Sequence, residues 1–340
     1  MRSRFAPGRR RRYRPGAGAA TVPPRPAGRG RSDCGGRGRG GAMLPIVFHP
    51  AYEAELPEGH RFPMRKYGRL AEILRARGLV PNGFVRPEPA GAPTVALAHD
   101  RAYVDQVLTA TVPRAVEKRI GLPVDAGVAR RSLASAGGTL LAGRLALAGG
   151  LAGSTAGGSH HARRAGGGGF CVLNDVAVAA LALLREGAIR RALVIDLDVH
   201  QGDGTADCLA GEPDLFTFSM HGERNYPTDK VPGDLDVGLP DGLDDAGYMA
   251  ALVRHVPRLL DALRPDLVFY NAGVDPHRDD RLGRLALTDE GLLARDRHVV
   301  GETRRRGIPL AAVIGGGYAT EIDALAARHA LVFEAMAEWA

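Results

Sequence analysis

The feature that most constrains the fold of this chain is a regular alternation of short apolar runs with longer segments of helical periodicity. Five apolar runs are typical of buried parallel strands: residues 94–99, 191–200, 214–220, 265–273 and 308–317. Three segments are predicted to be helices: residues 174–186, 245–263 and 289–306. This alternation predicts a three-layer α/β/α sandwich around a mainly parallel sheet, in which ligands bind outside the carboxyl ends of the strands.

One domain from residue 43 to residue 340 is the simplest division of the chain, because no repeat and no second composition shift follows residue 43. Residues 1–42 differ, since they are rich in glycine and proline and contain 12 arginines against one acid, Asp33. We expect this segment to be disordered because it cannot bury enough apolar surface. Met43 directly precedes the first ordered-looking sequence, so we favour a translation start there over a functional tail that binds nucleic acid weakly.

The charge of the chain comes mostly from that segment. The formal net charge is +7, but residues 43–340 contain 33 basic and 37 acidic residues and are mildly acidic. No apolar stretch reaches the roughly 18 residues that a membrane span needs, and no secretory signal is present, so a cytoplasmic location is expected. The three cysteines have no paired spacing and are predicted to be reduced thiols: Cys34, Cys171 and Cys208.

Two carboxylates and an imidazole end the second apolar run. Asp196, Asp198 and His200 are spaced by two, so on an extended strand their side chains would point to one face. Asp275 follows another apolar run and adds a carboxylate at the same edge of the sheet. Aspartate and neutral histidine are good ligands for zinc, and a set of three leaves the open coordination position of a catalytic site. The alternative is a buried strand end whose aspartates cap the next helix.

Two further segments could supply catalytic groups. His160 and His161 are adjacent between glycine pairs, and beside a metal they could take a proton from water and return it to a leaving amine. Without a metal, one would be a buried structural histidine and the other solvated. Tyr318 follows three glycines, whose turn could present the phenol to a developing oxyanion. The alternative for Tyr318 is a plain core position.

Together, and in this order, these segments resemble the histone deacetylase family of the arginase–deacetylase fold, from about Pro45 to Ala340. The stretches DLDVHQGDGT, VFYNAGVDPHRDDRLGRLALT and GGFCVLND are most similar to its class IV branch, where Gln201 replaces a histidine of classes I and II. The resemblance implies a bacterial class IV-like enzyme that hydrolyses acyl-lysine-type amides of a peptide or protein. Two alternatives remain, a small-molecule deacylase such as an acetylpolyamine amidohydrolase, and a non-enzymatic protein that binds nucleic acid or a partner through the arginine-rich tail.

The resemblance also implies metal sites. One Zn²⁺ per chain would be bound by Asp198, His200 and Asp275, with Fe²⁺ as an alternative in the cell. A structural K⁺ would be bound by oxygen atoms of five residues: Asp196, Asp198, His200, Ser219 and Met220. His277 raises the question of a second metal like that of the binuclear manganese ureohydrolases, but Gly202 stands where those enzymes need a carboxylate, so one metal is predicted.

The catalytic roles implied by the resemblance fall to five residues. His161 would be the general base and acid, oriented by Asp203. His160 would be an electrostatic partner of the transition state, oriented by Asp196, and Tyr318 would polarise the scissile carbonyl. A carboxylate partner favours the imidazolium whereas a metal ion opposes it, so the two histidines should titrate differently.

An apolar tunnel for the acyl-lysine stem is implied by the same resemblance. Its walls would be formed by Gly169, Phe170 and Tyr226, with Leu282 near the mouth and residues 60–64 at the rim. Three other histidines are expected to be structural: His49, His60 and His99. The sequence does not predict an oligomeric state.

Overall fold

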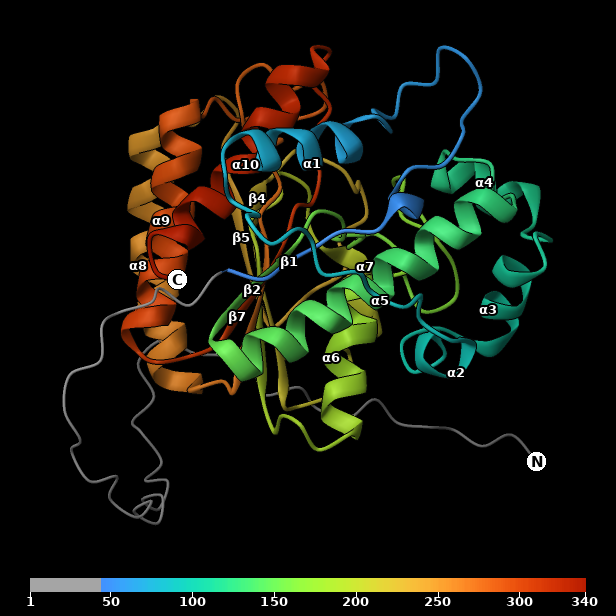
Figure 1. The fold of residues 1–340 in the computed structure, drawn as a ribbon, viewed down its shortest axis with the longest axis horizontal. Coiled ribbons are helices and arrows are strands. Elements are labelled where there is room, and N and C mark those ends of the chain that lie inside the picture. Colours follow the sequence, from blue (N-terminus) through green and yellow to red (C-terminus); the bar gives the residue numbers. More distant parts are fainter. Residues whose placement is uncertain (1–43) are drawn as a thin grey trace.

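A seven-stranded parallel sheet forms the centre of the computed structural model, which describes residues 44–340 (Figure 1). The spatial order is β1-β2-β7-β6-β3-β4-β5, and every neighbouring pair is parallel. The strands are β1 (Ile46–Val47), β2 (Leu151–Ser154), β3 (Ala192–Asp196), β4 (Leu215–Gly222), β5 (Leu235–Leu239), β6 (Leu267–Asn271) and β7 (Leu310–Val313). The predicted α/β fold is confirmed, whereas the expectations for residues 1–42 lie outside the described residues.

Helices cover both faces of the sheet, which gives three layers (Figure 1). On one side α8, α9 and α10 pack in sequence with α1 against α10, and on the other α5 packs against α6. The helical elements are η1 (Pro50–Tyr52), α1 (Lys66–Ala76), α2 (Ala92–Val95), α3 (Arg101–Leu108), α4 (Arg114–Ile120), α5 (Ala126–Gly149), α6 (Asp175–Arg185), α7 (Asp203–Cys208), α8 (Asp245–Leu263), α9 (Asp289–Arg305) and α10 (Ile322–Ala337). Among the described residues, no helix is long and apolar enough to cross a membrane.

The three predicted helices are present at α6, α8 and α9, and side-chain caps explain their starts. Asn174, Asp244 and Thr288 each accept a hydrogen bond from the backbone N–H three residues later. Four predicted strands are also present at β3, β4, β6 and β7, and all but β4 are shorter than predicted. Local capping chemistry and buried apolar runs were therefore sufficient for the central part of the fold.

The predicted strand at residues 94–99 is wrong, because this run forms the short helix α2 and the turn that follows it. Pro93 lies in the first turn of α2, where its fixed φ favours a helix start and its missing N–H costs nothing. Three strands were missed at β1, β2 and β5. β1 has two residues, β2 contains the small residues Ala152 and Gly153, and β5 is a short edge strand interrupted by Asp236 and Gly238.

The order of the strands determines where the site forms. β2, β7, β6 and β3 are consecutive neighbours in the sheet, so their carboxyl ends lie along one edge. The segments after these strands carry His160 and His161, Tyr318, Asp275, and Asp198 with His200, respectively. Residues that are more than 150 positions apart along the chain are thereby brought to one place.

Candidate metal centre

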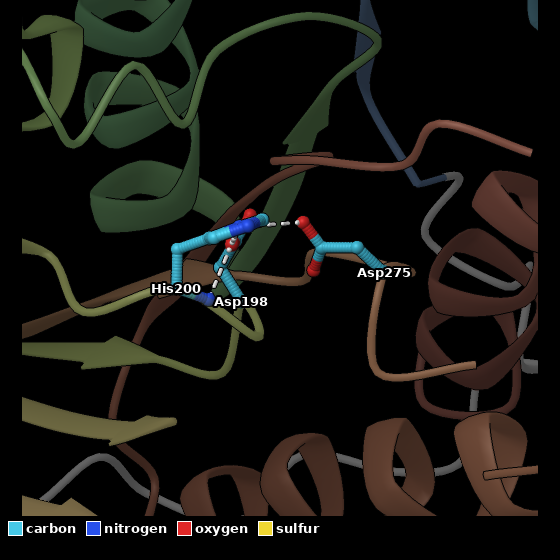
Figure 2. Close-up of side chains that lie close together, drawn as sticks. All are labelled: Asp198, His200 and Asp275. Carbon is cyan, nitrogen blue, oxygen red and sulfur yellow. Dashed lines mark hydrogen bonds and ion pairs between the residues drawn. The ribbon is translucent and has the colours of Figure 1, made fainter. Parts of the chain in front are cut away.

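The three side chains that the sequence suggested as metal ligands meet beyond the ends of β3 and β6 (Figure 2). Nδ1 of His200 lies 3.0 Å from Oδ1 of Asp198 and 3.2 Å from Oδ2 of Asp275. One ligand atom of each residue lies within 4.8 Å of the others, and all three side chains are buried. Within residues 44–340, these form the one group of three or more His, Cys, Asp or Glu side chains that could hold a metal ion.

The local backbone that presents these ligands differs from the extended strand that we expected. β3 ends at Asp196, and residues 198–200 form bends, so strand alternation does not align Asp198 with His200. Backbone donors fix the ligands instead. The His200 N–H donates to Oδ1 of Asp198 over 3.0 Å, and the Val199 N–H donates to Oδ1 of Asp275 over 2.8 Å. Each carboxylate is thus oriented before any ion binds.

The charge of the cluster fits a cation. Burial, and then the charge of Asp198, raises the pKa of Asp275 to about 7. Burial lowers the pKa of His200, but its hydrogen bonds to Asp198 and Asp275 outweigh that effect and raise the pKa to about 10. Two buried carboxylates therefore hold one proton on the imidazole between them, and a divalent ion could replace this proton.

Gly316 leaves the space that the cluster needs. A Cβ atom at this position would lie 2.2 Å from Oδ2 of Asp275 and 2.6 Å from Oδ2 of Asp198. The Gly316 N–H also donates to Oδ2 of Asp198 over 2.7 Å. The turn after β7 therefore both orients one ligand and keeps the space beside both carboxylates free, which supports the fit of a bound ion.

Two His–Asp pairs lie beside the metal ligands. The ring centroids of His160 and His161 are 4.1 Å apart. Nδ1 of His160 is 2.6 Å from Oδ2 of Asp196, and Nδ1 of His161 is 2.6 Å from Oδ1 of Asp203, the first residue of α7. The structure therefore brings together all four residues in the pairs that the resemblance implied.

The two pairs differ in electrostatics. Burial lowers the pKa of His160, but the charges of Asp196 and Asp198 outweigh it and raise this pKa to about 9. Burial, followed by the positive charge of His160, lowers the pKa of His161 to about 4. At neutral pH, His160 is therefore an imidazolium, whereas His161 is neutral with Nδ1 facing Asp203, which leaves Nε2 free to accept a proton.

Tyr318 also lies next to His200. Its ring centroid is 6.2 Å from that of His200 and 5.6 Å from that of Phe170. Burial, together with the charges of Asp198 and Asp275, raises the pKa of Tyr318 well above its ordinary value. The phenol therefore stays protonated and can donate a hydrogen bond.

Three residues expected to line a tunnel, Gly169, Phe170 and Tyr226, lie beside His161 or Tyr318. The Tyr226 ring stands edge-on to His161 with centroids 4.7 Å apart, and the Tyr226 side chain is exposed. A Cβ atom at Gly169 would lie 2.5 Å from Cδ2 of His161 and 3.0 Å from Cε1 of Tyr226, so any other residue here would collide with the His161 ring. Leu282 is also exposed, and its carbonyl accepts from Asn225 beside Tyr226.

The structure also shows the surroundings of the proposed potassium ligands, of His277 and of two cysteines. Asp196 pairs with Ser219 across β3 and β4, and these two of the five proposed potassium ligands line a cavity of about 10 Å³. His277 lies 3.2 Å from Asp289 and is not among the three clustered ligands. Cys171 and Cys208 are free and buried, whereas Cys34 lies outside the described residues.

Each of the three histidines expected to be structural is hydrogen-bonded to backbone groups. His49 accepts from the Ala51 N–H, and His60 accepts from the Phe62 N–H. Nε2 of His99 accepts from the Asn174 N–H over 2.9 Å, and its Nδ1 lies 3.0 Å from the carbonyl oxygen of Arg163. These contacts tie loops together and do not reach the metal cluster.

Three positively charged side chains that support the site were not predicted from the sequence. Arg163 donates to the second oxygen of Asp203 over 2.7 Å. Lys66, which is fully buried, donates to the carbonyls of Gly315 and Gly317, so it supports the turn that carries Tyr318. No spacing rule predicts these contacts, because each cation lies on a loop or helix whose position depends on the tertiary fold.

The third missed cation is Arg295 of α9, which is also fully buried. Its guanidinium donates to the carbonyl of Gly273 over 2.5 Å and to that of Leu197 over 3.3 Å. It also pairs with Asp296 over 2.9 Å. Arg295 therefore joins the loop after β3 to the loop after β6, the two loops that carry the metal ligands.

Comparisons with known proteins agree with this geometry. Residues 60–335 match the family model of the histone deacetylase domain. The chain belongs to the histone deacetylase family. It is therefore a hydrolase that acts on amides, and deacetylation is its general reaction.

Similar proteins cover most of the chain. A probable deacetylase of Methanothermobacter thermautotrophicus is 30% identical over 301 residues, which cover 81% of this chain and 86% of that protein. An uncharacterized protein of Picosynechococcus is 48% identical over 293 residues, covering 86% and 98%. The crystal structure of the HDA15 HD domain superposes with a TM-score of 0.74 at 21% identity, covering 87% and 88%, and shows the same fold.

Proposed function

We propose that residues 43–340 form a zinc-dependent deacylase that hydrolyses acyl-lysine-type amides to a carboxylate and a free amine. The observation that carries this proposal is that both the neutral His161 and the protonated Tyr318 lie next to His200 of the Asp198–His200–Asp275 cluster. One Zn²⁺ would be held by these three ligands, and Fe²⁺ could replace it in the cell. A bound ion of this kind polarises the carbonyl and acidifies water.

The remaining chemistry falls to side chains of this chain. Nε2 of His161 accepts a proton from the attacking water while the oxygen of that water bonds to the carbonyl carbon. His161 later gives this proton to the amine nitrogen as the C–N bond breaks. Asp203 holds the other ring nitrogen, over 2.6 Å, so that the ring keeps the orientation needed for both transfers. His160, held by Asp196, supplies positive charge near the developing oxyanion.

Tyr318 donates its phenolic hydrogen to the same oxygen. Gly169, Phe170 and Tyr226 form the tunnel for the acyl-lysine stem, with Leu282 at its mouth, and keep solvent from the reacting atoms. A structural K⁺ would be bound by oxygen atoms from Asp196, Asp198, His200, Ser219 and Met220. The small cavity beside Asp196 and Ser219, about the volume of one water, supports such an ion.

Gln201 supports a place in the class IV branch of the family. Its Nε2 donates to the carbonyl of Val231 over 2.8 Å and to Asp236 over 2.9 Å, and its Oε1 accepts from the Val231 N–H over 3.1 Å. A histidine could not satisfy all three contacts at once, because its ring offers two nitrogen atoms. Gln201 thus anchors the loop that leads from Tyr226 to β5.

The Tyr318→Phe variant tests the mechanism. We expect kcat to fall by about 10²- to 10³-fold, because one hydrogen bond to the oxyanion is lost. Metal content and melting temperature should stay unchanged, since the phenolic hydroxyl has no hydrogen-bond partner among residues 44–340 that the change would remove. Full activity in a folded variant with its metal bound would contradict the oxyanion role.

A substrate panel separates lysine deacylation from the alternative of a small-molecule deacylase. Acetyl-lysine peptides, long-chain acyl-lysine peptides and acetylpolyamines are compared by kcat/KM. The proposal requires turnover of acyl-lysine compounds, and a preference for acetylpolyamines would replace it with the alternative. Deletion of residues 1–42 should leave this activity intact. If nucleic-acid binding were the function instead, the panel would show no turnover and the deletion would abolish binding.

A further inference from the structure

The mouth of the proposed tunnel is surrounded by arginines that have no acidic partner. Arg61, Arg119 and Arg281 are exposed, and none of the three forms an ion pair with any residue from 44 to 340. Residues 43–340 as a whole carry four more acidic than basic side chains, so this local excess of positive charge is not a general property of the surface. We call these three residues the arginine collar.

Contacts with tunnel residues place the collar at the mouth. The Arg61 guanidinium carbon lies 5.0 Å from the centre of the Phe170 ring. A Cβ atom added at Gly121 would lie 3.1 Å from Cε1 of Phe170 and 3.9 Å from Nη2 of Arg61, so both groups flank this glycine. Arg61 has no hydrogen bond from its guanidinium to another described residue, and its five N–H donors are therefore available to a ligand.

Arg119 stands on the Tyr226 side of the mouth. A Cβ atom at Gly168 would lie 3.3 Å from the Tyr226 hydroxyl and 3.8 Å from Cγ of Arg119. The carbonyl of Arg119 accepts from the Gly169 N–H, and its Nε donates to the carbonyl of Gly167 over 2.9 Å. These contacts fix the base of the side chain beside the passage and leave its two terminal amino groups without a carboxylate.

Arg281 connects the collar to the catalytic turn. Its Nε donates to the carbonyl of Tyr318 over 2.7 Å, and its Nη2 donates to the carbonyl of Arg61 over 3.1 Å. The neighbouring acid, Asp280, makes no direct bond with it, because the Asp280 oxygens accept from the backbone N–H groups of Tyr318, Leu282 and Gly283. Arg281 is thus held in place by carbonyls and has no carboxylate bonded to it among residues 44–340.

We propose that the arginine collar recognises a carboxylate carried by the substrate next to the acylated lysine, and so selects acyl-lysine compounds with a negative charge at that position over acetylated polyamines. Cations that face one pocket without a counter-ion repel one another, and an anion relieves that repulsion. Guanidinium groups bind carboxylates with two parallel hydrogen bonds. The free ammonium of an acetylated polyamine would instead be repelled. This inference rests on the proposed deacylase function.

The test uses four substrates that carry the acyl chain found best in the substrate panel. Two are Nα-blocked Nε-acyl-lysines that differ only in a free α-carboxylate or an α-carboxamide. The third is a peptide amide with glutamate after the acyl-lysine, and the fourth is the monoacylated diamine. We expect kcat/KM to be about 10-fold higher for at least one carboxylate-bearing substrate than for the carboxamide, mainly through KM, and this ratio should fall with added salt. The two carboxylate substrates distinguish a terminal carboxylate from an acidic side chain.

Variants of Arg61 test whether the collar causes the preference for carboxylate-bearing substrates. Arg61 is suitable because its replacement removes no side-chain hydrogen bond to another described residue. Arg61→Gln should abolish most of the preference, and Arg61→Glu should reverse it. Arg254→Gln, at an exposed arginine of α8 that forms no ion pair with any residue from 44 to 340, is the matched control and should keep the preference. Equal kcat/KM for the charged and uncharged lysine substrates in the wild type overturns this inference but leaves the deacylase function intact. No turnover of any acyl-lysine in the panel overturns both.

Discussion

The two His–Asp pairs beside the metal cluster have the same geometry and opposite protonation. Each imidazole lies 2.6 Å from its carboxylate and each ring is buried, yet the pKa of His160 is raised to about 9 and that of His161 is lowered to about 4. His160 faces a second carboxylate, Asp198, whereas the partner of His161 is shared with Arg163. The charges around a pair, not the pair itself, therefore decide which histidine can act as a base.

The most severe test of this difference is the His161→Gln variant. If His161 is the proton carrier, kcat should fall by about 10³- to 10⁴-fold, because no other neutral base lies at this position. Steady-state kinetics with metal analysis of the same sample would check this, since metal content should stay at the wild-type level. A loss of less than tenfold would assign the proton transfer to another group.

The His160→Gln variant should have a smaller effect on rate, about 10²-fold, because it removes electrostatic stabilisation and not the base. It should also shift the pH profile. The rate requires neutral His161, and the positive charge of His160 lowers the pKa of His161. Without that charge this pKa rises, so the acid limb of kcat/KM against pH should move to higher pH. A limb that does not move would show that the two rings are not coupled.

Arg163→Gln should also move the acid limb of kcat/KM to higher pH, by about 1 pH unit or less. The charge of Asp203 would no longer be shared with Arg163, so it would raise the pKa of His161 more strongly. The variant keeps both histidines, so kcat at neutral pH should change little. Arg164→Gln is the neighbouring control, since Arg164 forms no ion pair in the described part of the chain. A downward shift in the Arg163 variant would contradict the shared-carboxylate explanation.

His99 offers a comparison with a buried histidine whose hydrogen-bond partners in the described part of the chain are backbone groups and not a carboxylate. Burial lowers its pKa from 6.5 to about 4, so the unfolded chain takes up a proton below pH 6.5 while the folded chain does not. Its contribution to stability is therefore present above pH 6.5 and is lost as pH falls towards 4, by about 2 kcal/mol at pH 5. Urea unfolding at pH 7 and pH 5 should show a smaller pH-dependent loss in His99→Gln than in the wild type. Equal losses would assign the acid sensitivity to other groups.

Much of this site could be predicted from the sequence because its residues follow buried apolar runs. Asp198, His200 and Asp275 come after strands whose carboxyl ends must share one edge, so their convergence follows from a parallel sheet. The detailed reason was wrong, since β3 stops at Asp196 and backbone N–H groups orient the ligands. The hydrophobic pattern of the sequence is enough to predict which loops form that edge. The orientation of each ligand, in contrast, depends on hydrogen bonds between distant segments.

The supporting cations could not be predicted in the same way. Lys66, Arg163 and Arg295 reach the site from α1, from a loop and from α9, and no periodicity distinguishes them from solvated basic residues. The strands β1 and β2 were missed for a related reason, since short runs of small residues are recognised as strands only when their neighbours in the sheet are known.

Arg295 has a consequence for how the ligand loops can open. One guanidinium bonds to carbonyls in both loops, so a loop can leave its place only by breaking its bond to this shared buried cation, which would then be partly unpaired. We therefore expect the amide hydrogens of residues 197–200 and 272–275 to exchange with solvent in one cooperative event that also loosens α9. The release of a bound ion would then be a slow process, set by that rare opening and not by the fraying of a single loop.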